Sequence, residues 1–242
     1  MRHIWQDEPL SMDTSIWRYF TQDRFLDALQ SRTMYFASAQ QFEDPFEGAV
    51  AVQAHDFPID PRYAEPESTE LAFQQLRRYT KISSWHVADY ESDAMWKLYT
   101  GERKGIAVHS TIGRATAAFM PFRLEPTFGV EEPMQGMVRY VDLRESRLRA
   151  GLEDRFFHKH RAFESEREFR FAISLRMAAE YGVAVPTEGI RVPFSPHELI
   201  QEILLGPSLS QAERTTFMQR YESIGSIVAP RVSTLLGRPR YV

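Results

Sequence analysis

The sequence predicts an α+β fold: a single domain with a mostly antiparallel sheet, split or mixed, and flanking helices. Segments with the alternation of strands and segments with helical spacing follow one another without a steady βαβ rhythm, which favours α+β over α/β. The length of 242 residues and the mass of 28.2 kDa suit one hydrophobic core. We therefore expect a polar lead-in over residues 1–14 and a single domain over residues 15–242.

The N-terminal part of the chain is predicted to form a strand, a helix and a second strand. Residues 16–20, Ile-Trp-Arg-Tyr-Phe, form a strand in which Arg18 is one charge among four large apolar side chains. Residues 22–30 have helical spacing, and Thr21 is the expected N-cap. Residues 33–38 follow as the second strand.

The middle of the chain is expected to alternate between helices and strands joined by long connections. Pro and Gly concentrate in segments 54–66 and 121–136, which favours surface loops. Ser92 is the expected N-cap of one helix, and Ser110 or Thr111 of the next. The expected elements are helices over residues 68–79, 92–99 and 111–118 and strands over residues 81–87, 104–109 and 137–142.

Charged side chains are most concentrated where a further helix is expected to lead into a strand. The apolar face of that helix would consist of Leu148, Leu152, Phe156, His160 and Phe163. Charged and apolar residues alternate over residues 165–175, which is typical of a half-buried strand. Glu166, Glu168 and Arg170 would then stand in one row, about 6.5–7 Å apart, within reach of a single small ligand. The competing interpretation is a ladder of structural ion pairs.

The C-terminal part of the chain is predicted to form a strand, a helix and an edge strand. Residues 199–205 are the strand, and Ser210-Gln211-Ala212-Glu213 is a capping box for a helix that ends near residue 224. Residues 227–236 would close the fold at a sheet edge, where Pro230 is tolerated.

Composition narrows the class of protein. The net charge of −4 and the pI near 6.0 give no global electrostatic case for nucleic-acid binding. The chain has no cysteine, which excludes disulfides and thiolate metal sites. Neither a signal peptide nor an apolar run long enough to span a bilayer is found, so we expect a soluble, cytoplasmic protein without a membrane partner.

An acidic turn offers a second candidate site. Glu43-Asp44-Pro45-Phe46-Glu47 carries three carboxylates, and if a divalent cation binds there, Glu47 is the first choice of ligand. The favoured interpretation is structural, because Asp44 can accept hydrogen bonds from backbone N–H groups of the turn while Phe42 and Phe46 fill the core. His158 and His160 would point in different directions on the predicted helix. We therefore predict no metal site.

Six motifs occur in order between residues 16 and 175. They are Trp-Arg-Tyr-Phe at 17–20, Met-Tyr-Phe-Ala-Ser at 34–38, Phe-Glu-Asp-Pro-Phe-Glu at 42–47, Met-Trp-Lys-Leu-Tyr at 95–99, Lys-Gly-Ile-Ala-Val at 104–108 and Glu-Arg-Glu-Phe-Arg at 166–170. Together they resemble the bacterial domain-of-unknown-function 2971 family, which usually has Asn in place of Glu43 and Trp in place of Phe163. The resemblance implies a small bacterial or phage-linked cytoplasmic protein, and it supplies no settled activity.

A more distant resemblance concerns the order Arg18, then Ser83-Ser84, then Glu166-Arg167-Glu168. It is similar to ADP-ribosyltransferases of the Arg-Ser-Glu type, although the serine strand lacks the threonine of the full motif. The resemblance implies that Arg18 holds the diphosphate of NAD and that Ser83 or Ser84 supports the carboxylate. It also implies that Glu168 is the catalytic carboxylate and Glu166 its partner.

Two further residues are expected to bind the nucleotide. Arg170 is the next charge on the same predicted strand face, and Tyr19, with Tyr35 as the alternative, is the aromatic side chain expected in the cleft. Aromatic rings stack on bases and guanidinium groups bind phosphate, which suits a nucleotide ligand. Core packing is the competing interpretation for most of the aromatic residues.

The leading hypothesis is a nucleotide-handling effector, an NAD-dependent ADP-ribosyltransferase-like toxin or anti-phage defence protein. NAD would be its substrate, and a protein or nucleic acid the acceptor. The first alternative is a non-catalytic sensor for a nucleotide or phage product, which would use Arg18 and Arg170 as an anion pocket. The second is a metal-dependent nuclease that uses Glu47, Glu166 and Glu168.

Overall fold

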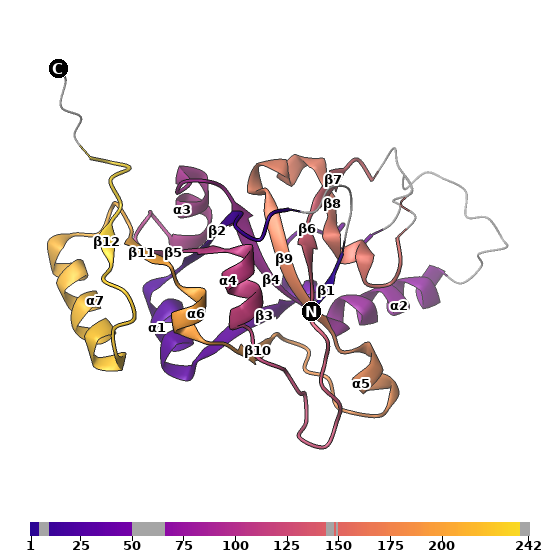
Figure 1. Ribbon diagram of the computed structural model, residues 1–242. Coiled ribbons are helices and arrows are strands. Elements are labelled where there is room, and N and C mark those ends of the chain that lie inside the picture. The colour runs from indigo at the N-terminus through magenta and orange to yellow at the C-terminus, as the bar shows by residue number, and fades with distance from the viewer. Residues whose placement is uncertain (5–9, 50–65, 144–147, 149, 238–242) are drawn as a thin grey trace. The chain divides into compact units, whose positions relative to one another are not determined.

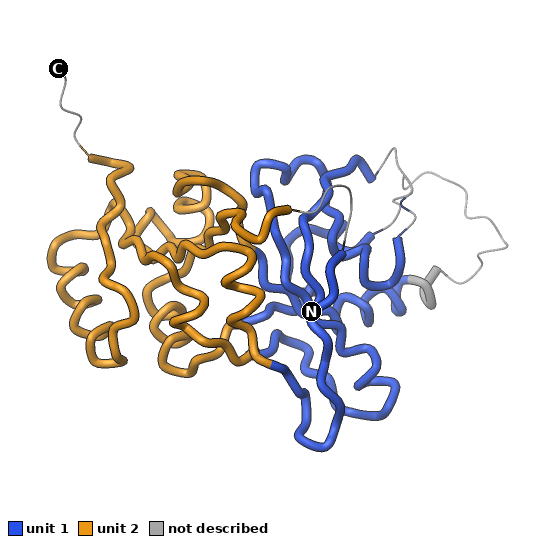
Figure 2. Tube along the Cα trace, viewed as in Figure 1, with its two compact units in different colours: residues 1–9, 35–84, 121–191 blue, residues 10–34, 85–120, 192–242 orange. Residues whose placement is uncertain are grey.

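A computed structural model describes the chain except for residues 5–9, 50–65, 144–147, 149 and 238–242. The chain forms two compact units (Figure 2). Unit 1 consists of residues 1–9, 35–84 and 121–191, and unit 2 of residues 10–34, 85–120 and 192–242. Strands pair mostly antiparallel and are flanked by helices, so the α+β class is confirmed (Figure 1). The single domain over residues 15–242 stays a prediction.

Unit 1 contains a mixed set of paired strands. Their order is β1 (Arg2–His3), β6 (Met134–Met137), β9 (Glu168–Ser174) and then the first part of β4 (Thr80–Val87), to which the end of β3 (Thr33–Ser38) also pairs. β6 and β9 are antiparallel, whereas β1 pairs in parallel with β6. A separate parallel pair is formed by β7 (Arg139–Val141) and β8 (His158–His160). β1 therefore makes a strand within the predicted polar lead-in.

Short helices complete unit 1. They are η1 (Ala39–Gln41), α2 (Pro66–Tyr79), η3 (Asp154–Phe157), η4 (Arg161–Glu166) and α5 (Arg176–Glu180). The apolar cluster of this unit joins side chains from several of these elements: Ala39, Ile82, Met134, Phe156, Phe157 and Ala172, with Ile4, Phe42 and Leu76 packed against them. Two of its members, Phe156 and Phe157, are fully buried. Burial of each such ring stabilises the fold by about 1.5–3 kcal/mol.

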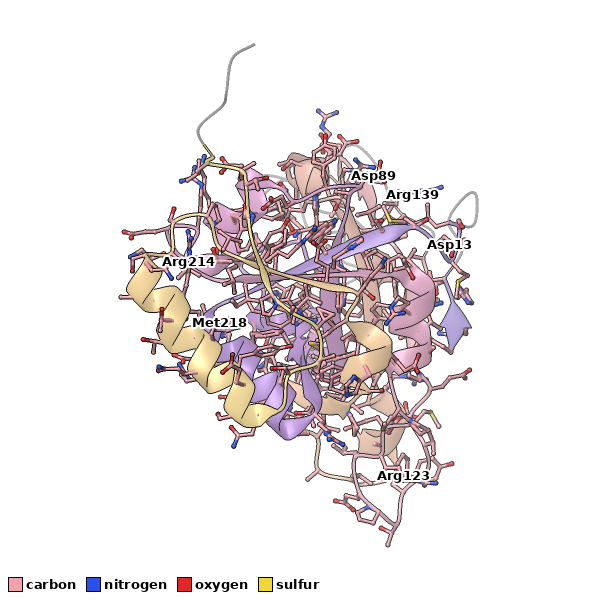
Figure 3. The ribbon with its side chains drawn as sticks, turned by 60° about the vertical axis from the view of Figure 1, so that its left-hand side comes forward. Asp13, Asp89, Arg123, Arg139, Arg214 and Met218 are labelled. Carbon is pink, nitrogen blue, oxygen red and sulfur yellow. The ribbon has the colours of Figure 1, made fainter. Side chains whose placement is uncertain are left out.

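Unit 2 pairs β2 (Ser15–Phe20) antiparallel with β5 (Ile106–Thr111) and with the last part of β4. β11 (Glu202–Leu205) continues antiparallel from β5, and the short β12 (Arg231–Val232) pairs in parallel with β11. Its helices are α1 (Gln22–Ser31), α3 (Asp93–Thr100), α4 (Ile112–Ala118), α6 (Pro196–Leu199) and α7 (Gln211–Ile224). Figure 3 places Arg214 and Met218 one turn apart on α7. β10 (Ile190–Pro193) carries the chain from unit 1 into unit 2.

The two faces of β2 contact different helices of unit 2. Trp17 and Tyr19 pack with Met95 and Trp96 of α3, whereas Phe20 lies on the other face with Phe25 of α1. Phe25 in turn stacks on Phe217 and Tyr221 of α7. The alternation of β2 residues thus places α3 on one side of these strands and α1 and α7 on the other (Figure 1).

Most helix starts follow the predicted caps. The side chains of Thr21, Ser92 and Thr111 each accept a hydrogen bond from a backbone N–H of the first turn, and Ser210 forms the predicted capping box with Glu213. A capping side chain replaces one of the backbone partners that a helix start lacks, so local chemistry alone fixes these boundaries.

Three predicted elements are wrong in type or length. The helix expected to end at Phe163 is replaced by η3, β8 and η4, because Phe156 and Phe157 pack in the apolar cluster of unit 1 and the next three residues pair with β7 as a strand. The strand expected over residues 137–142 is divided between β6 and β7. The C-terminal strand is reduced to β12, because only two residues pair with β11.

Two predictions about segments are answered only in part. The loop expected over residues 54–66 lies outside the described residues, apart from Pro66, which begins α2. The connection expected over residues 121–136 is irregular until β6 begins at Met134, and Figure 3 places Arg123 in it. Within the described residues, no helix has the length and apolar character needed to cross a membrane.

Candidate active site

The charged residues of β9 lie on the buried side of the strand in unit 1. Glu168 and Arg170 are two residues apart and share a face with Ala172 of the apolar cluster. The Arg170 Nε–H donates to Glu168 Oε2 at 2.7 Å. The prediction of a half-buried strand with a charged outer face is therefore wrong, because every residue of β9 up to Ile173 is buried.

Arg170 makes its closest ionic contact with the acidic turn. Its Nη1 and Nη2 donate to the two carboxylate oxygens of Glu47 at 2.6 and 3.0 Å, and both side chains are 0% exposed. Nη1 also donates to the backbone oxygen of Phe156 at 2.6 Å. Such a bidentate, fully buried contact fixes the guanidinium plane. The predicted anion-binding role of Arg170 thus competes with internal partners for the same N–H groups.

Glycine at position 48 holds the acidic turn against the core. Gly48 has φ of 79°, and a Cβ atom there would come within 2.5 Å of the Phe156 ring. A side chain at this position would therefore strain the backbone and displace the ring. The close approach places the preceding residue, Glu47, beside Arg170.

Lys159 joins the two glutamates. Its Nζ donates to Glu168 Oε1 at 2.7 Å and to Glu166 Oε2 at 2.8 Å, and it lies 4.4 Å from the centre of the Phe163 ring. Lys159 itself is buried. We name the five ionic residues Glu47, Lys159, Glu166, Glu168 and Arg170 the charged cluster.

Glu166 reaches this cluster from outside the strand. It ends η4, and Arg167, the next residue, adopts the left-handed conformation with φ of 41°. This conformation is uncommon for a residue with a side chain, and it turns the chain sharply into β9. The predicted row of three charges along one strand face is therefore wrong for Glu166, although the turn still brings it to Lys159 beside Glu168.

The two carboxyl groups of the pair have opposite electrostatic environments. Burial raises the pKa of Glu166 to about 7, and its hydrogen bond with Glu168 adds to the rise. Burial also acts to raise the pKa of Glu168, but Arg170 and Lys159 outweigh it and hold that pKa well below its usual range. Two neighbouring acids whose pKa values are driven apart are the usual arrangement of an acid–base pair.

Lys159 and the neighbouring Tyr140 hydroxyl both contact Glu168, and both have raised pKa values. Burial acts to lower the pKa of Lys159, but Glu168 and Glu166 reverse this and raise it. The Tyr140 hydroxyl accepts a hydrogen bond from the backbone N–H of Glu168 at 2.8 Å, and burial raises the pKa of this hydroxyl. Tyr140 therefore anchors the start of β9 as a neutral phenol.

The serine residues predicted to support the carboxylate lie on β4, the strand next to β9. Ser83 is fully buried and Ser84 is partly exposed. No hydrogen bond joins Ser84 to the charged cluster among the described residues. The supporting role of Ser83 or Ser84 stays a prediction.

Arg18 and Tyr19 belong to unit 2. The Arg18 guanidinium carbon lies 5.3 Å from the centre of the Phe20 ring and 5.8 Å from that of Trp85. Burial, with a contribution from Arg24, lowers the pKa of Arg18 to about 10. Tyr19 is buried against Trp96, and its hydroxyl accepts a hydrogen bond from the Ser92 backbone at 2.7 Å. Their predicted contacts with the nucleotide stay predictions.

The acidic turn has the structural contacts that its proline motif predicts. Asp44 Oδ1 accepts a hydrogen bond from the Phe46 N–H at 2.9 Å, and Phe42 packs against the apolar cluster. Glu47, the first choice as a metal ligand, is bound to Arg170 through both oxygens. In the described part of the chain, no group of three or more His, Asp or Glu side chains is placed to hold a metal ion.

Two ionic pairings of the charged cluster are not predicted by the sequence, although the nuclease alternative groups Glu47 with Glu166 and Glu168. Lys159 was assigned to a helix, and its pairing with Glu166 and Glu168 depends on the strand β8 that replaces that helix. Glu47 lies 123 positions before Arg170, and no local pattern connects them. Both residues occur in the motifs named above for 42–47 and 166–170, but the order of these motifs carries no information on contact.

Within unit 1, the charged cluster is a buried ionic network that contains two neighbouring carboxyl groups with different pKa values. No family model matches the chain, and no curated protein matches it. The resemblance to the domain-of-unknown-function 2971 family therefore stays a prediction.

Solved structures give a weak likeness. The chain is similar to DarT of Thermus sp. 2.9 in complex with carba-NAD+, at 15% identity and a TM-score of 0.37 over 92% of this chain and 96% of that one. For the complex with NAD+ the values are 13%, 0.39, 93% and 96%, and for that with ADP-ribosylated ssDNA they are 10%, 0.37, 94% and 96%. At these values the likeness assigns neither an activity nor a ligand to this chain.

Proposed function

We propose that this chain is an NAD-dependent ADP-ribosyltransferase-like effector whose acid–base centre is the carboxyl pair Glu166 and Glu168. One observation carries the proposal: two adjacent carboxyl groups are held by one lysine, and their surroundings drive their pKa values in opposite directions. Perturbed pairs of this kind occur preferentially at functional sites.

The chemistry suits cleavage of a glycosidic bond. In the transfer we propose, the bond between ribose C1′ and the nicotinamide nitrogen breaks, and its electron pair leaves with nicotinamide. Positive charge develops on the ribose, and a carboxylate that remains ionised stabilises such a charge. Glu168 meets this requirement, because Arg170 and Lys159 keep it deprotonated at neutral pH.

Glu166 is suited to the proton transfer that completes the reaction. As a nucleophilic group of the acceptor bonds to C1′, its proton must move to a base. The pKa of Glu166, about 7, places the group close to the pH at which a general base works best. The acceptor is a protein or a nucleic acid, or water if the reaction is NAD hydrolysis.

Release of nicotinamide from NAD tests this function. We expect the purified protein to release nicotinamide, and we expect Glu166→Gln to lower the rate by about 100-fold or more, the usual contribution of a general base. Glu164→Gln is the matched control, because Glu164 is an exposed glutamate on the same short helix. It should keep the rate within about twofold.

Each arm of the experiment can contradict part of the proposal. If the wild-type protein releases no nicotinamide with any acceptor tested between about pH 6 and 9, the enzymatic function is wrong. If Glu166→Gln is as active as Glu164→Gln, the function stands but the assignment of the base is wrong. Arg18→Ala separately tests the predicted diphosphate contact, which should appear as a raised KM.

A binding module is the second candidate, in which Arg170 belongs to a fixed ionic scaffold and Arg18 is left as the anion-binding residue. All three nitrogens of the Arg170 guanidinium donate to internal partners: Nε to Glu168, Nη2 to Glu47, and Nη1 to both Glu47 and the Phe156 carbonyl. A closed ionic network of this kind is also suited to a fixed scaffold for recognition. Calorimetric binding of NAD without release of nicotinamide would support this candidate.

A further inference from the structure

Lys159 occupies an unusual position between the two glutamates. An ammonium group has three N–H donors, and those of Lys159 have three neighbours: Glu166 at 2.8 Å, Glu168 at 2.7 Å and the Phe163 ring at 4.4 Å. The side chain is 9% exposed, so water contributes little to its solvation. The ammonium group is therefore fixed by the two carboxyl groups that it joins.

The elements that surround Lys159 are close to it in the sequence. β8 pairs with β7 so that Lys159 lies opposite Tyr140, whose hydroxyl binds the backbone of Glu168. η4 then supplies Phe163 and Glu166, and the left-handed residue Arg167 returns the chain to Glu168. All of these contacts except that of Tyr140 come from one stretch of ten residues, 159–168.

The ionisable groups around Glu166 come from three elements. β8 contributes Lys159, β9 contributes Glu168 and Arg170, and β7 contributes Tyr140. Glu47 lies on the far side of Arg170. Two cations therefore face three carboxyl groups, and the charged cluster is neutral when one of these groups holds a proton.

The contacts decide which carboxyl group of the pair holds that proton. Glu168 binds both cations, one through each oxygen, whereas Lys159 is the cation that contacts Glu166. The Glu166 side chain is also the more exposed of the two, at 13% against 6%. Ionisation is consequently favoured at Glu168, and proton exchange with a ligand is favoured at Glu166.

We propose, on the basis of the function proposed above, that Lys159 is a positioning residue: its ammonium group holds the two carboxyl groups together and directs proton acceptance to Glu166. Lys159 does not contact the reacting atoms in this scheme. It acts by stabilising the ionised form of each carboxyl group at a fixed separation from the other. Without it, Glu166 would remain protonated at neutral pH and could not accept a proton.

Carboxyl 13C NMR tests this role directly on the folded protein. The Glu166 side-chain signal, assigned by its absence in Glu166→Gln, should titrate near pH 7 in the wild-type protein. In Lys159→Met the midpoint should move upward by about one pH unit or more, because the cation that favours ionisation is gone. Lys159→Arg keeps the positive charge, so its midpoint should stay close to that of the wild-type protein. Lys97→Met, which removes an exposed lysine paired with Asp93 in unit 2, is the control and should leave the midpoint unchanged.

A second measurement applies if Lys159→Met does not fold. In the wild-type protein, the 15N signal of the Lys159 ammonium group should move with the same midpoint as the Glu166 carboxyl carbon, because the two groups are in contact. Different midpoints for the two signals, or an unchanged Glu166 midpoint in folded Lys159→Met, would overturn the role of Lys159.

The pH profile of nicotinamide release separates this inference from the function itself. If the enzyme is active, its rate should rise with pH as Glu166 loses its proton. The midpoint of this rise should lie at a higher pH in Lys159→Met than in the wild-type protein, by the same shift as the NMR midpoint. If the wild-type protein releases no nicotinamide, the proposed function fails, and the NMR titration still decides whether Lys159 controls the proton on Glu166.

Discussion

The buried cores of the two units are built from different interactions. In unit 1, Arg170 and Glu47 are completely buried and satisfy each other through two hydrogen bonds. In unit 2, the buried core contains the aromatic side chains of Trp17, Tyr19 and Trp96 instead. Their N–H and O–H groups form hydrogen bonds with neighbouring residues. The Trp96 Nε1–H, for example, donates to Glu91 at 2.7 Å.

This difference separates stability from function. Aromatic burial stabilises a fold directly, whereas a buried ion pair is often no more stabilising than well-packed apolar side chains of the same volume. Stability alone therefore does not account for five ionic groups in unit 1. The ionic arrangement does account for a pair of acids with different affinities for a proton, which the aromatic core of unit 2 does not provide.

The largest expected effect comes from breaking the ionic core. Arg170→Met should lower the free energy of unfolding by about 3–5 kcal/mol, because it leaves Glu47 and Glu168 buried without their cation. Urea denaturation measures the change. Arg176→Met removes a surface arginine paired with Glu180 and should cost less than about 1 kcal/mol. Equal effects of the two variants would contradict the distinction between the buried cluster and surface ion pairs.

A smaller effect should appear in the pH dependence of stability. Because the pKa of Glu166 is raised in the folded state, the folded protein binds a proton that the unfolded chain releases between pH 4.5 and about 7. Stability should therefore fall as pH rises through this window, by on the order of 2 kcal/mol. Below the window the sign reverses, because the lowered pKa of Glu168 contributes stability that is lost on acidification.

Glu166→Gln isolates the first of these two effects. The decline between pH 4.5 and about 7 should be smaller in this variant, because burial also raises the pKa values of Glu47 and Glu131, while the loss of stability at lower pH remains. Glu164→Gln should retain both features. Urea midpoints measured across the pH range test this, and an undiminished decline in Glu166→Gln would show that Glu166 is not the group responsible.

The smallest expected effect probes unit 2. Tyr19→Phe removes the hydroxyl that accepts a hydrogen bond from the Ser92 N–H, and it should lower the free energy of unfolding by about 1 kcal/mol. The effect should be independent of pH between about 5 and 8, because burial raises the pKa of the Tyr19 hydroxyl and keeps it neutral. A pH-dependent effect would mean that the aromatic core is electrostatically coupled to a titrating group.

The sequence alone determined the features that depend on neighbouring residues. The helix starts at Thr21, Ser92 and Ser210 were predictable because a capping side chain acts on the backbone two or three positions away. The strands β2, β3 and β4 followed from the alternation and β-branched or aromatic content of their residues. The concentration of charge around β9 was also visible, and it pointed to the residues that form the candidate site.

Only the tertiary structure decided how those charges are paired. Alternation predicted an exposed row of Glu166, Glu168 and Arg170, but β9 is covered on the side that carries Glu168 and Arg170, and the left-handed Arg167 places Glu166 off the strand. The partner of Arg170 is Glu47, 123 positions away in the chain. Local patterns describe the preferences of neighbouring residues, whereas burial and long-range ion pairing depend on which distant segments the folded chain brings together. Burial and ion pairing in turn set the protonation of the carboxyl groups in the candidate site.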